Sequence, residues 1–200
     1  MTIYSLSTDL ELWSAFKGGD DGAYEYIYNR HAPELFSYGL HIVRNRQLVE
    51  DCVHDLFVYL FQHRATLGDT DAIKYYLFKS LRRRVIEVLE KQSKAAQESR
   101  AVAENYHDHA LATASQEVNM IEAETSLAKN RRLTQAIENL PPRQKEAIYL
   151  LYFSKLEYEE IAAIMSLSIR TVYNQIHTAI QTLRKELGSA NAHRLPVFLE

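Results

Sequence analysis

The sequence predicts an all-α protein of two small helical domains joined by a flexible linker. Six glycines and four prolines in 200 residues are too few for a turn-rich β fold, since average usage would give about twice as many. Apolar side chains recur at steps of three and four, which is the period of an amphipathic helix. This pattern stops between residues 92 and 130, and the interruption divides the chain.

The first domain is expected over residues 1–91. Helical patterns there cover Leu12–Phe16, Tyr24–Leu40, Val49–Phe61 and Ala72–Lys91. The Gly-rich turn at residues 18–22 separates the first two segments, and a loop containing Gly68 precedes the last one. We expect these four helices to close one small core.

Residues 92–130 are predicted to form the linker, because they are rich in Ala, Gln and Glu and have no sustained apolar stripe. The second domain is expected over residues 131–188, followed by a tail over 189–200. Pro141 and Pro142 should end one helix and open the next, because proline is tolerated in a first helical turn. The helices expected after the diproline are Arg143–Phe153, Glu159–Met165 and Ile169–Leu187, the last closed by Gly188.

The two final helices, with the turn Ser166–Ser168 between them, are typical of a helix-turn-helix. Ala162 permits a close approach of the two helices, and Ser168 is expected to cap the second one. An apolar stripe should face inward: Ile169, Val172, Ile176, Ala179, Ile180, Leu183 and Leu187. The candidate DNA-reading residues are Ser168, Arg170, Thr171, Tyr173, Asn174 and His177. Arg and Asn are side chains that read base edges in the major groove, whereas the alternative is an ordinary solvated face.

Charge is distributed unevenly along a chain whose formal net charge is −3. Residues 1–70 and 101–130 are acidic, while residues 71–100 and 131–200 are basic. An approaching polyanion meets the local field rather than the total charge. The segregation therefore indicates separate surfaces with separate partners.

Two further segments are candidate binding surfaces. Lys74–Arg84 interleaves aromatic and basic residues, a combination that suits single-stranded nucleic acid, although the aromatic residues could equally be core and the arginines a solvated face. The helix Val49–Phe61 presents acidic side chains beside protruding apolar ones, which would fit a protein partner with a basic, apolar surface. Its alternative is again an ordinary solvated face.

Several function classes are disfavoured by the sequence. One cysteine, Cys52, excludes an internal disulfide and a cysteine-based zinc site. No segment resembles a membrane span or a signal peptide, so a cytoplasmic protein is expected. Asp51-x-x-His54 and Glu104-x-x-His107 each resemble half of a di-metal site, but the second pair lies in the linker, where no core would hold it. With no nucleophile or phosphate-binding signature, we expect neither an enzyme nor a metal, cofactor or small-molecule substrate.

Taken together, the motifs resemble bacterial RNA polymerase sigma factors of the extracytoplasmic-function group, most closely those of Bacteroidetes and the iron-citrate regulator type. Residues 49–57, Val-Glu-Asp-Cys-Val-His-Asp-Leu-Phe, carry the first likeness, with His54 in the place of the usual Gln. Residues 140–145, Leu-Pro-Pro-Arg-Gln-Lys, carry the second, together with Glu160-Ile161-Ala162 and the segment Ser168–Val172. Ser166 stands where the turn usually has Gly.

The resemblance implies a factor that binds core RNA polymerase and directs promoter-specific initiation. The residues it implies at the clamp helices of the polymerase's largest subunit are Glu50, Asp51, His54, Asp55, Val58 and Phe61. Those implied at the melted minus-10 element are Lys74, Tyr75, Lys79, Arg82, Arg83 and Glu87. The carboxyl-terminal domain would read the minus-35 element while resting on the polymerase flap, and an anti-sigma protein is implied as a further partner. An autonomous helix-turn-helix regulator is the rival interpretation.

Overall fold

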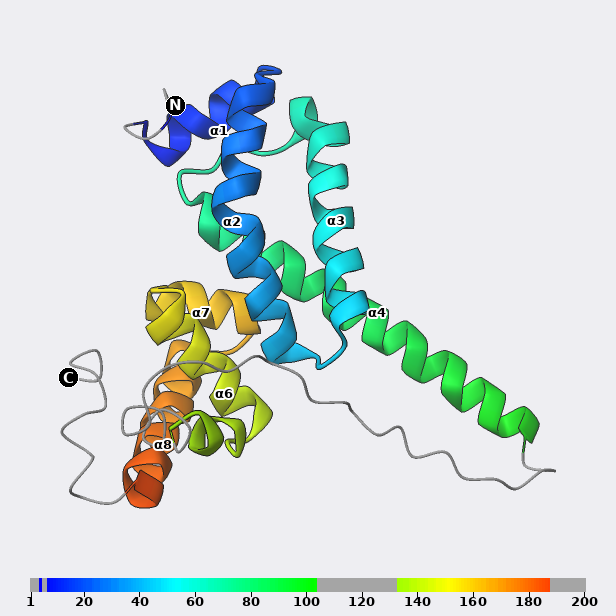
Figure 1. The fold of residues 1–200 in the computed structure, drawn as a ribbon, viewed down its shortest axis with the longest axis vertical. Coiled ribbons are helices and arrows are strands. Elements are labelled where there is room, and N and C mark those ends of the chain that lie inside the picture. The colour runs from blue at the N-terminus through cyan, green and yellow to red at the C-terminus, as the bar shows by residue number, and fades with distance from the viewer. Residues whose placement is uncertain (1–3, 5–6, 104–132, 188–200) are drawn as a thin grey trace, which may run out of the picture.

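The computed structural model describes residue 4, residues 7–103 and residues 133–187, and all regular structure in these ranges is helical. The amino-terminal half contains α1 (Asp9–Lys17), α2 (Asp21–Ile42), α3 (Arg46–His63), the short 3₁₀ turn η2 (Arg64–Thr66) and α4 (Ile73–Ala103) (Figure 1). The carboxyl-terminal half contains a helical segment over residues 133–138, then α6 (Pro142–Ile148), the π-helical segment η3 (Tyr149–Phe153), α7 (Tyr158–Met165) and α8 (Ile169–Leu187). The all-α prediction is confirmed.

The first four helices pack against one another, and their buried side chains belong to one hydrophobic cluster that continues into the carboxyl-terminal half. Side chains that bond free amides fix their starts, because the first turn of a helix leaves its N–H groups without backbone partners. The Oγ1 atom of Thr8 accepts from the Glu11 amide at 3.3 Å, Asp20 accepts from the Gly22 amide at 2.8 Å, and Asn45 accepts from the Leu48 amide at 3.1 Å. These caps explain why α1, α2 and α3 begin before their first apolar residues.

Helices α2 and α3 approach closely at Gly39. A Cβ atom placed on Gly39 would lie 2.5 Å from Cγ1 of Val49, well inside van der Waals contact. The glycine is therefore needed for contact rather than for backbone freedom. The single cysteine, Cys52, is a buried free thiol on α3.

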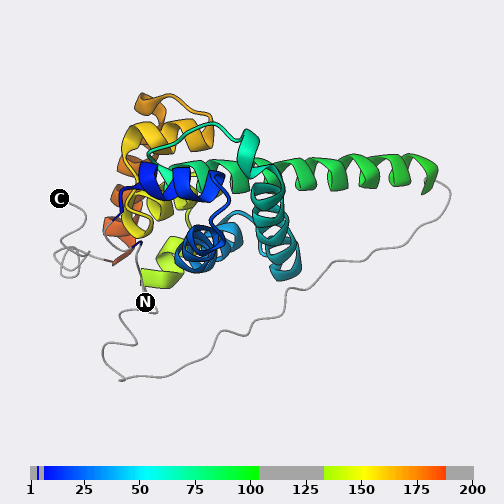
Figure 2. The ribbon, with the colours of Figure 1, turned by 90° about the horizontal axis from the view of Figure 1, so that it is seen from above.

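Helix α4 continues to Ala103, well past the predicted end at Lys91. Residues 92–103 contain no glycine or proline and several strong helix formers, so helix propensity carries the helix on without an apolar stripe. Figure 2 shows the last turns of α4 extending away from the other helices. The rest of the predicted linker, residues 104–130, lies outside the described residues, as do the predicted helix end at Gly188 and the predicted tail, residues 189–200.

The carboxyl-terminal half departs from the prediction at two points. The segment expected as a continuous helix to Phe153 changes at Tyr149 into η3, where the rings of Tyr149 and Phe153 stack at 5.4 Å. The inward stripe of α8 is confirmed at Val172, Ile176, Ala179 and Leu183, which are buried, whereas Ile180 is half-buried. The prediction is wrong for Ile169, which is 48% exposed. Helical side chains lean toward the amino terminus, so the side chain of the first residue leans beyond the helix.

The two halves pack against each other. Helix α4 contacts α7, and α2 contacts both α6 and η3. At the centre of this contact, the Tyr38 ring lies 4.9 Å from the Phe78 ring and 5.9 Å from the Tyr149 ring. Of the helices in the described ranges, none has the length and apolarity that crossing a membrane requires.

Candidate nucleic-acid interface

The turn between α7 and α8 has the geometry of a helix-turn-helix. Ser166 adopts a left-handed conformation, with φ 55° and ψ 47°, at the position where Gly is usual because a Cβ is disfavoured there. The amide of Leu167 donates to the carbonyl of the buried Ala162 at 2.9 Å. Oγ of Ser168 accepts from the Thr171 amide at 3.1 Å, which confirms the predicted cap.

The candidate DNA-reading residues share one side of α8. Arg170, Tyr173, Asn174 and His177 are exposed, and Tyr173 retains 57% of its accessible surface. The Tyr173 and His177 rings are nearly parallel, with centroids 6.1 Å apart. Thr171 is half-buried, and its hydroxyl lies 2.8 Å from that of Ser168. The exposed edge of α8 is therefore amphiphilic, with amide, guanidinium and ring groups available to a partner.

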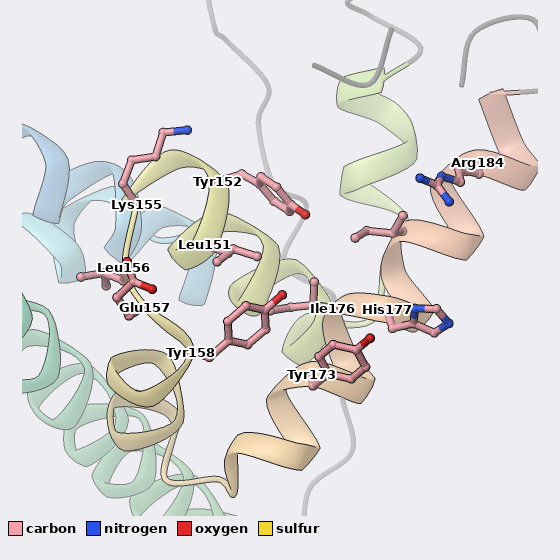
Figure 3. A pocket seen from close by; sticks show the side chains of 11 residues that line it. Leu151, Tyr152, Lys155, Leu156, Glu157, Tyr158, Tyr173, Ile176, His177 and Arg184 are labelled. Atoms are coloured by element: carbon pink, nitrogen blue, oxygen red, sulfur yellow. The ribbon is translucent and has the colours of Figure 1, made fainter. Parts of the chain in front are cut away.

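A groove of about 510 Å³ lies beside this edge, between α8 and the chain that joins η3 to α7. Its apolar side includes Leu151, Leu156 and Ile176 (Figure 3). Tyrosine and charged side chains also line it: Tyr152, Lys155, Glu157, Tyr158, Tyr173, His177 and Arg184. Burial raises the pKa of the Tyr152 and Tyr158 hydroxyls, so both remain protonated donors at neutral pH.

The six residues implied at the minus-10 element do not form one surface. Lys79, Arg83 and Glu87 lie exposed on α4 with the half-buried Tyr75. Their side chains are joined in pairs along the helix: Lys79 Nζ donates to Tyr75 Oη at 3.0 Å, and Arg83 Nε donates to Glu87 Oε1 at 2.8 Å. These two hydrogen-bonded pairs therefore form an ordered polar surface along α4.

The other two residues of that set turn toward neighbouring helices. Nζ of Lys74 lies 2.6 Å from Oε1 of Glu34 on α2. Nε of Arg82 lies 2.7 Å from Oε1 of Glu146 on α6, and only 20% of the Arg82 side chain is exposed. The structure thus keeps Arg82 away from the exposed side of α4.

The acidic side of α3 is exposed as expected. Glu50, Asp51, His54 and Asp55 are exposed together with Phe61, and Val58 is half-buried beside them. Glu50 accepts from Arg46 Nε at 2.8 Å, and Asp55 accepts from Arg84 at 3.3 Å. A groove of about 420 Å³ adjoins this face between α2 and α3.

No cluster of three or more potential metal-ligating side chains occurs in the described parts of the chain. Asp51 and His54 are exposed on α3. Glu104 and His107, the second half of the suspected di-metal pattern, lie outside the described residues.

Family comparison assigns both halves. The Sigma-70 region 2 model matches residues 27–95, and the Sigma-70 region 4 model matches residues 130–183, together more than half of the chain. The chain is 23% identical over 158 residues to the extracytoplasmic-function (ECF) RNA polymerase sigma factor SigM of Bacillus subtilis, covering 79% of this chain and 91% of that protein. It is also 23% identical to ECF sigma factor SigK of Mycobacterium tuberculosis, covering 90% of this chain and 94% of SigK. The chain belongs to the ECF sigma factors.

Two solved structures share the fold. The sigma factor RpoE, in complex with the anti-sigma factor NepR from Bartonella quintana, superposes with a TM-score of 0.55 at 21% identity, covering 78% of this chain and 90% of RpoE. CnrH, in complex with the cytosolic domain of CnrY, superposes with a TM-score of 0.60 at 16% identity, covering 90% of this chain and 97% of CnrH. The family matches show that this sigma factor directs promoter-specific transcription. Region 2, residues 27–95, comprises most of α2, all of α3 and most of α4.

Tyr173 and His177 of the groove were expected from the sequence, but sequence reasoning missed Arg184, Tyr152 and Tyr158. Arg184 lies seven residues after His177, two helical turns along the same side of α8, so extending the helical count would have found it. Tyr152 and Tyr158 lie on either side of the turn after η3. Their convergence depends on how that turn folds, and no periodic pattern encodes it.

Proposed function

We propose that this sigma factor reads the minus-35 element with α8, holds the melted minus-10 element on α4 and docks on core polymerase through α3. The observation that carries the proposal is α8 itself: one side is buried in region 4, and the opposite side exposes Arg170, Tyr173, Asn174 and His177. A B-form major groove admits one helix presented in this way. Ser168 and Thr171 lie at the same helix start and complete the set.

The minus-10 role of α4 is supported by charge and by aromatic surface. Tyr75 offers a ring for stacking, Lys79 and Arg83 offer cations for the phosphate backbone, and the Glu87 carboxylate can accept from a base amino group. A groove of about 360 Å³ between α3 and α4 adjoins them and includes Tyr59, Tyr76 and Arg83 in its lining. Its aromatic and cationic lining suits an unstacked base beside its phosphate, since unstacking costs a few kcal/mol that such contacts offset.

Docking on core polymerase is proposed for the acidic face of α3: Glu50, Asp51, His54, Asp55, Val58 and Phe61. Exposed carboxylates around an apolar groove suit a basic protein surface, here the clamp helices of the largest subunit. Region 4 would rest on the flap.

Transcription in a purified system tests the whole assignment. We expect the chain to start specific transcripts from a genomic DNA library only when core polymerase is added, and to bind duplex promoter DNA weakly alone. Tight, specific duplex binding without polymerase would instead favour the rival, an autonomous helix-turn-helix regulator.

Arg170→Ala tests base reading at the minus-35 element. If the guanidinium contacts a base, discrimination between the correct and a mutated element should fall by about 1–3 kcal/mol. Fluorescence anisotropy of the holoenzyme on both DNAs measures this difference. Lys185→Ala is the matched control, because it removes one positive charge from the last turn of the same helix. An equal loss on both DNAs for Arg170→Ala would mean a phosphate contact and would refute base reading.

The finer assignments follow from the same likeness. The motifs at residues 49–57 and 140–145 support placement in the iron-citrate regulator branch found in Bacteroidetes. An anti-sigma protein is proposed as a partner because RpoE and CnrH were each solved in complex with another protein, NepR and CnrY respectively. We also propose that the chain is a non-enzymatic, cytoplasmic subunit without cofactor or small-molecule substrate.

A further inference from the structure

A buried polar cluster joins region 2 to region 4. Oη of Tyr38, on α2, donates to Oε1 of Glu146 on α6 at 2.8 Å. Arg82, on α4, donates to the same carboxylate through Nε at 2.7 Å and through Nη2 at 3.5 Å. Tyr38 and Glu146 are both buried. The three residues, called here the latch, therefore come from both regions and meet only where the regions touch.

The surroundings of the latch are apolar and aromatic. The ring of Tyr38 packs against both Phe78 of region 2 and Tyr149 of region 4. At the rim of the interface, Glu138 forms ion pairs with both Arg44 and Lys145. A carboxylate buried in such a site is stable only when it is paired and hydrogen-bonded, and region 2 supplies both partners of Glu146.

The protonation states of the latch support this arrangement. Burial, reinforced by the neighbouring Glu146 carboxylate, raises the pKa of the Tyr38 hydroxyl well above its usual range. Burial alone would lower the pKa of Arg82, but its hydrogen bond and charge attraction to Glu146 raise it overall. Tyr38 therefore stays a donor and Arg82 stays charged throughout the physiological pH range.

The packing of region 4 against region 2 conflicts with the proposed DNA contacts in two ways. First, this packing places Arg82, which the family resemblance implies at the minus-10 element, against Glu146 of region 4. Secondly, the two promoter elements lie about 25 base pairs apart, which is roughly 85 Å along B-form DNA at 3.4 Å per base pair. The α4 and α7 helices are in direct contact, and α8 packs on α7. The two DNA-reading surfaces cannot span that distance while the regions stay packed.

We infer that the latch of Tyr38, Arg82 and Glu146 holds this sigma factor in a closed state that cannot engage a promoter, and that opening separates region 4 from region 2 and frees Arg82. The inference rests on the proposed DNA contacts of α4 and α8. The latch itself is a property of the free chain, so it can be measured without DNA or polymerase.

Tyr38→Phe is the most conservative test, because it removes one hydroxyl and keeps the ring. Without the hydroxyl, the buried Glu146 carboxylate loses a hydrogen bond. The ratio of closed to open molecules should therefore fall by about tenfold. Single-molecule energy transfer between dyes on Glu25→Cys and Thr178→Cys reports the ratio, since both sites are exposed whereas Cys52 is buried. Tyr26→Phe removes a half-exposed hydroxyl from the same helix and should leave the ratio unchanged.

Charge exchange gives the second, stronger test. Glu146→Arg and Arg82→Glu should each lower the closed-to-open ratio by about 100-fold or more, as expected when one partner of a buried pair is lost. The double variant should recover much of the closed population, which a general loss of folding would not do. Glu159→Arg, an exposed charge reversal in region 4, is the control. Circular dichroism verifies that each variant keeps its helices.

The outcomes separate the latch from the proposed function. Equal closed populations for wild type and Tyr38→Phe, or a wild-type chain that is already open, would overturn the latch. Opening by Tyr38→Phe should also raise the initial rate of transcription at limiting core polymerase. Opening with no promoter-specific transcript from any variant would leave the latch standing and refute the promoter assignment.

Discussion

Glu50→Lys combined with Asp55→Lys is expected to abolish association with core polymerase. Both carboxylates are exposed on α3, so the reversal should change the docking face rather than the core. Placing like charges across an interface costs several kcal/mol, which corresponds to a loss of affinity of roughly 100-fold or more. The fold should survive, because the ion pairs of Glu50 with Arg46 and of Asp55 with Arg84 lie at the surface, where such pairs contribute about 0–1 kcal/mol.

Biolayer interferometry with immobilised core polymerase measures this loss directly. The control is Glu25→Lys with Glu90→Lys, which makes the same change in net charge on exposed positions of α2 and α4. The control variant should bind nearly as well as wild type. If both double variants lost affinity equally, overall charge would account for the effect and α3 would lose its assignment.

Trp13→Ala should destabilise region 2 by about 3–5 kcal/mol, the usual cost of removing a large buried aromatic side chain. Trp13 is fully buried, and its ring lies 5.2 Å from Phe16 and 5.1 Å from Tyr76. Its Nε1–H donates to the Gly68 carbonyl at 2.9 Å. Because Gly68 belongs to the loop before α4, the substitution should also loosen the loop that precedes the proposed minus-10 surface.

Urea unfolding followed by circular dichroism measures the free energy of unfolding. Fluorescence would not serve, since Trp13 is the only tryptophan in the sequence. Trp13→Phe separates the two contributions: it keeps most of the ring contacts but loses the hydrogen bond, so it should cost about 1–3 kcal/mol. A loss below 1 kcal/mol for Trp13→Ala would show that the core is not organised around this side chain.

Local patterns predicted the parts of this fold that depend on local chemistry. The amino-terminal cap and the buried stripe of α8 were predictable because Ser168 and Val172 act within a few residues of chain. The exposed acidic face of α3 was predictable for the same reason, since a helical period assigns each residue to a side. Ile169 shows the limit, because an apolar residue in the right register still lies exposed when it falls on the first turn.

Contacts between distant segments were not predictable from periodicity. Glu146 is separated from Arg82 by 64 residues and from Tyr38 by 108, and no local pattern relates them. The family resemblance implies a DNA contact for Arg82, and that implication does not include the packing of region 4 against α4. The groove beside Tyr173 was missed for the same reason, since Tyr158 reaches it from another helix.

The π-helical turn at Tyr149–Phe153 contains one residue that the segment could lose. A π turn holds one residue more than an α turn, so deleting one residue would let the turn return to regular α winding while the residues on either side keep their faces. A residue inserted into regular α winding would instead turn the following residues by about 100°. A one-residue deletion in this turn should therefore be better tolerated during evolution than a one-residue insertion in α6.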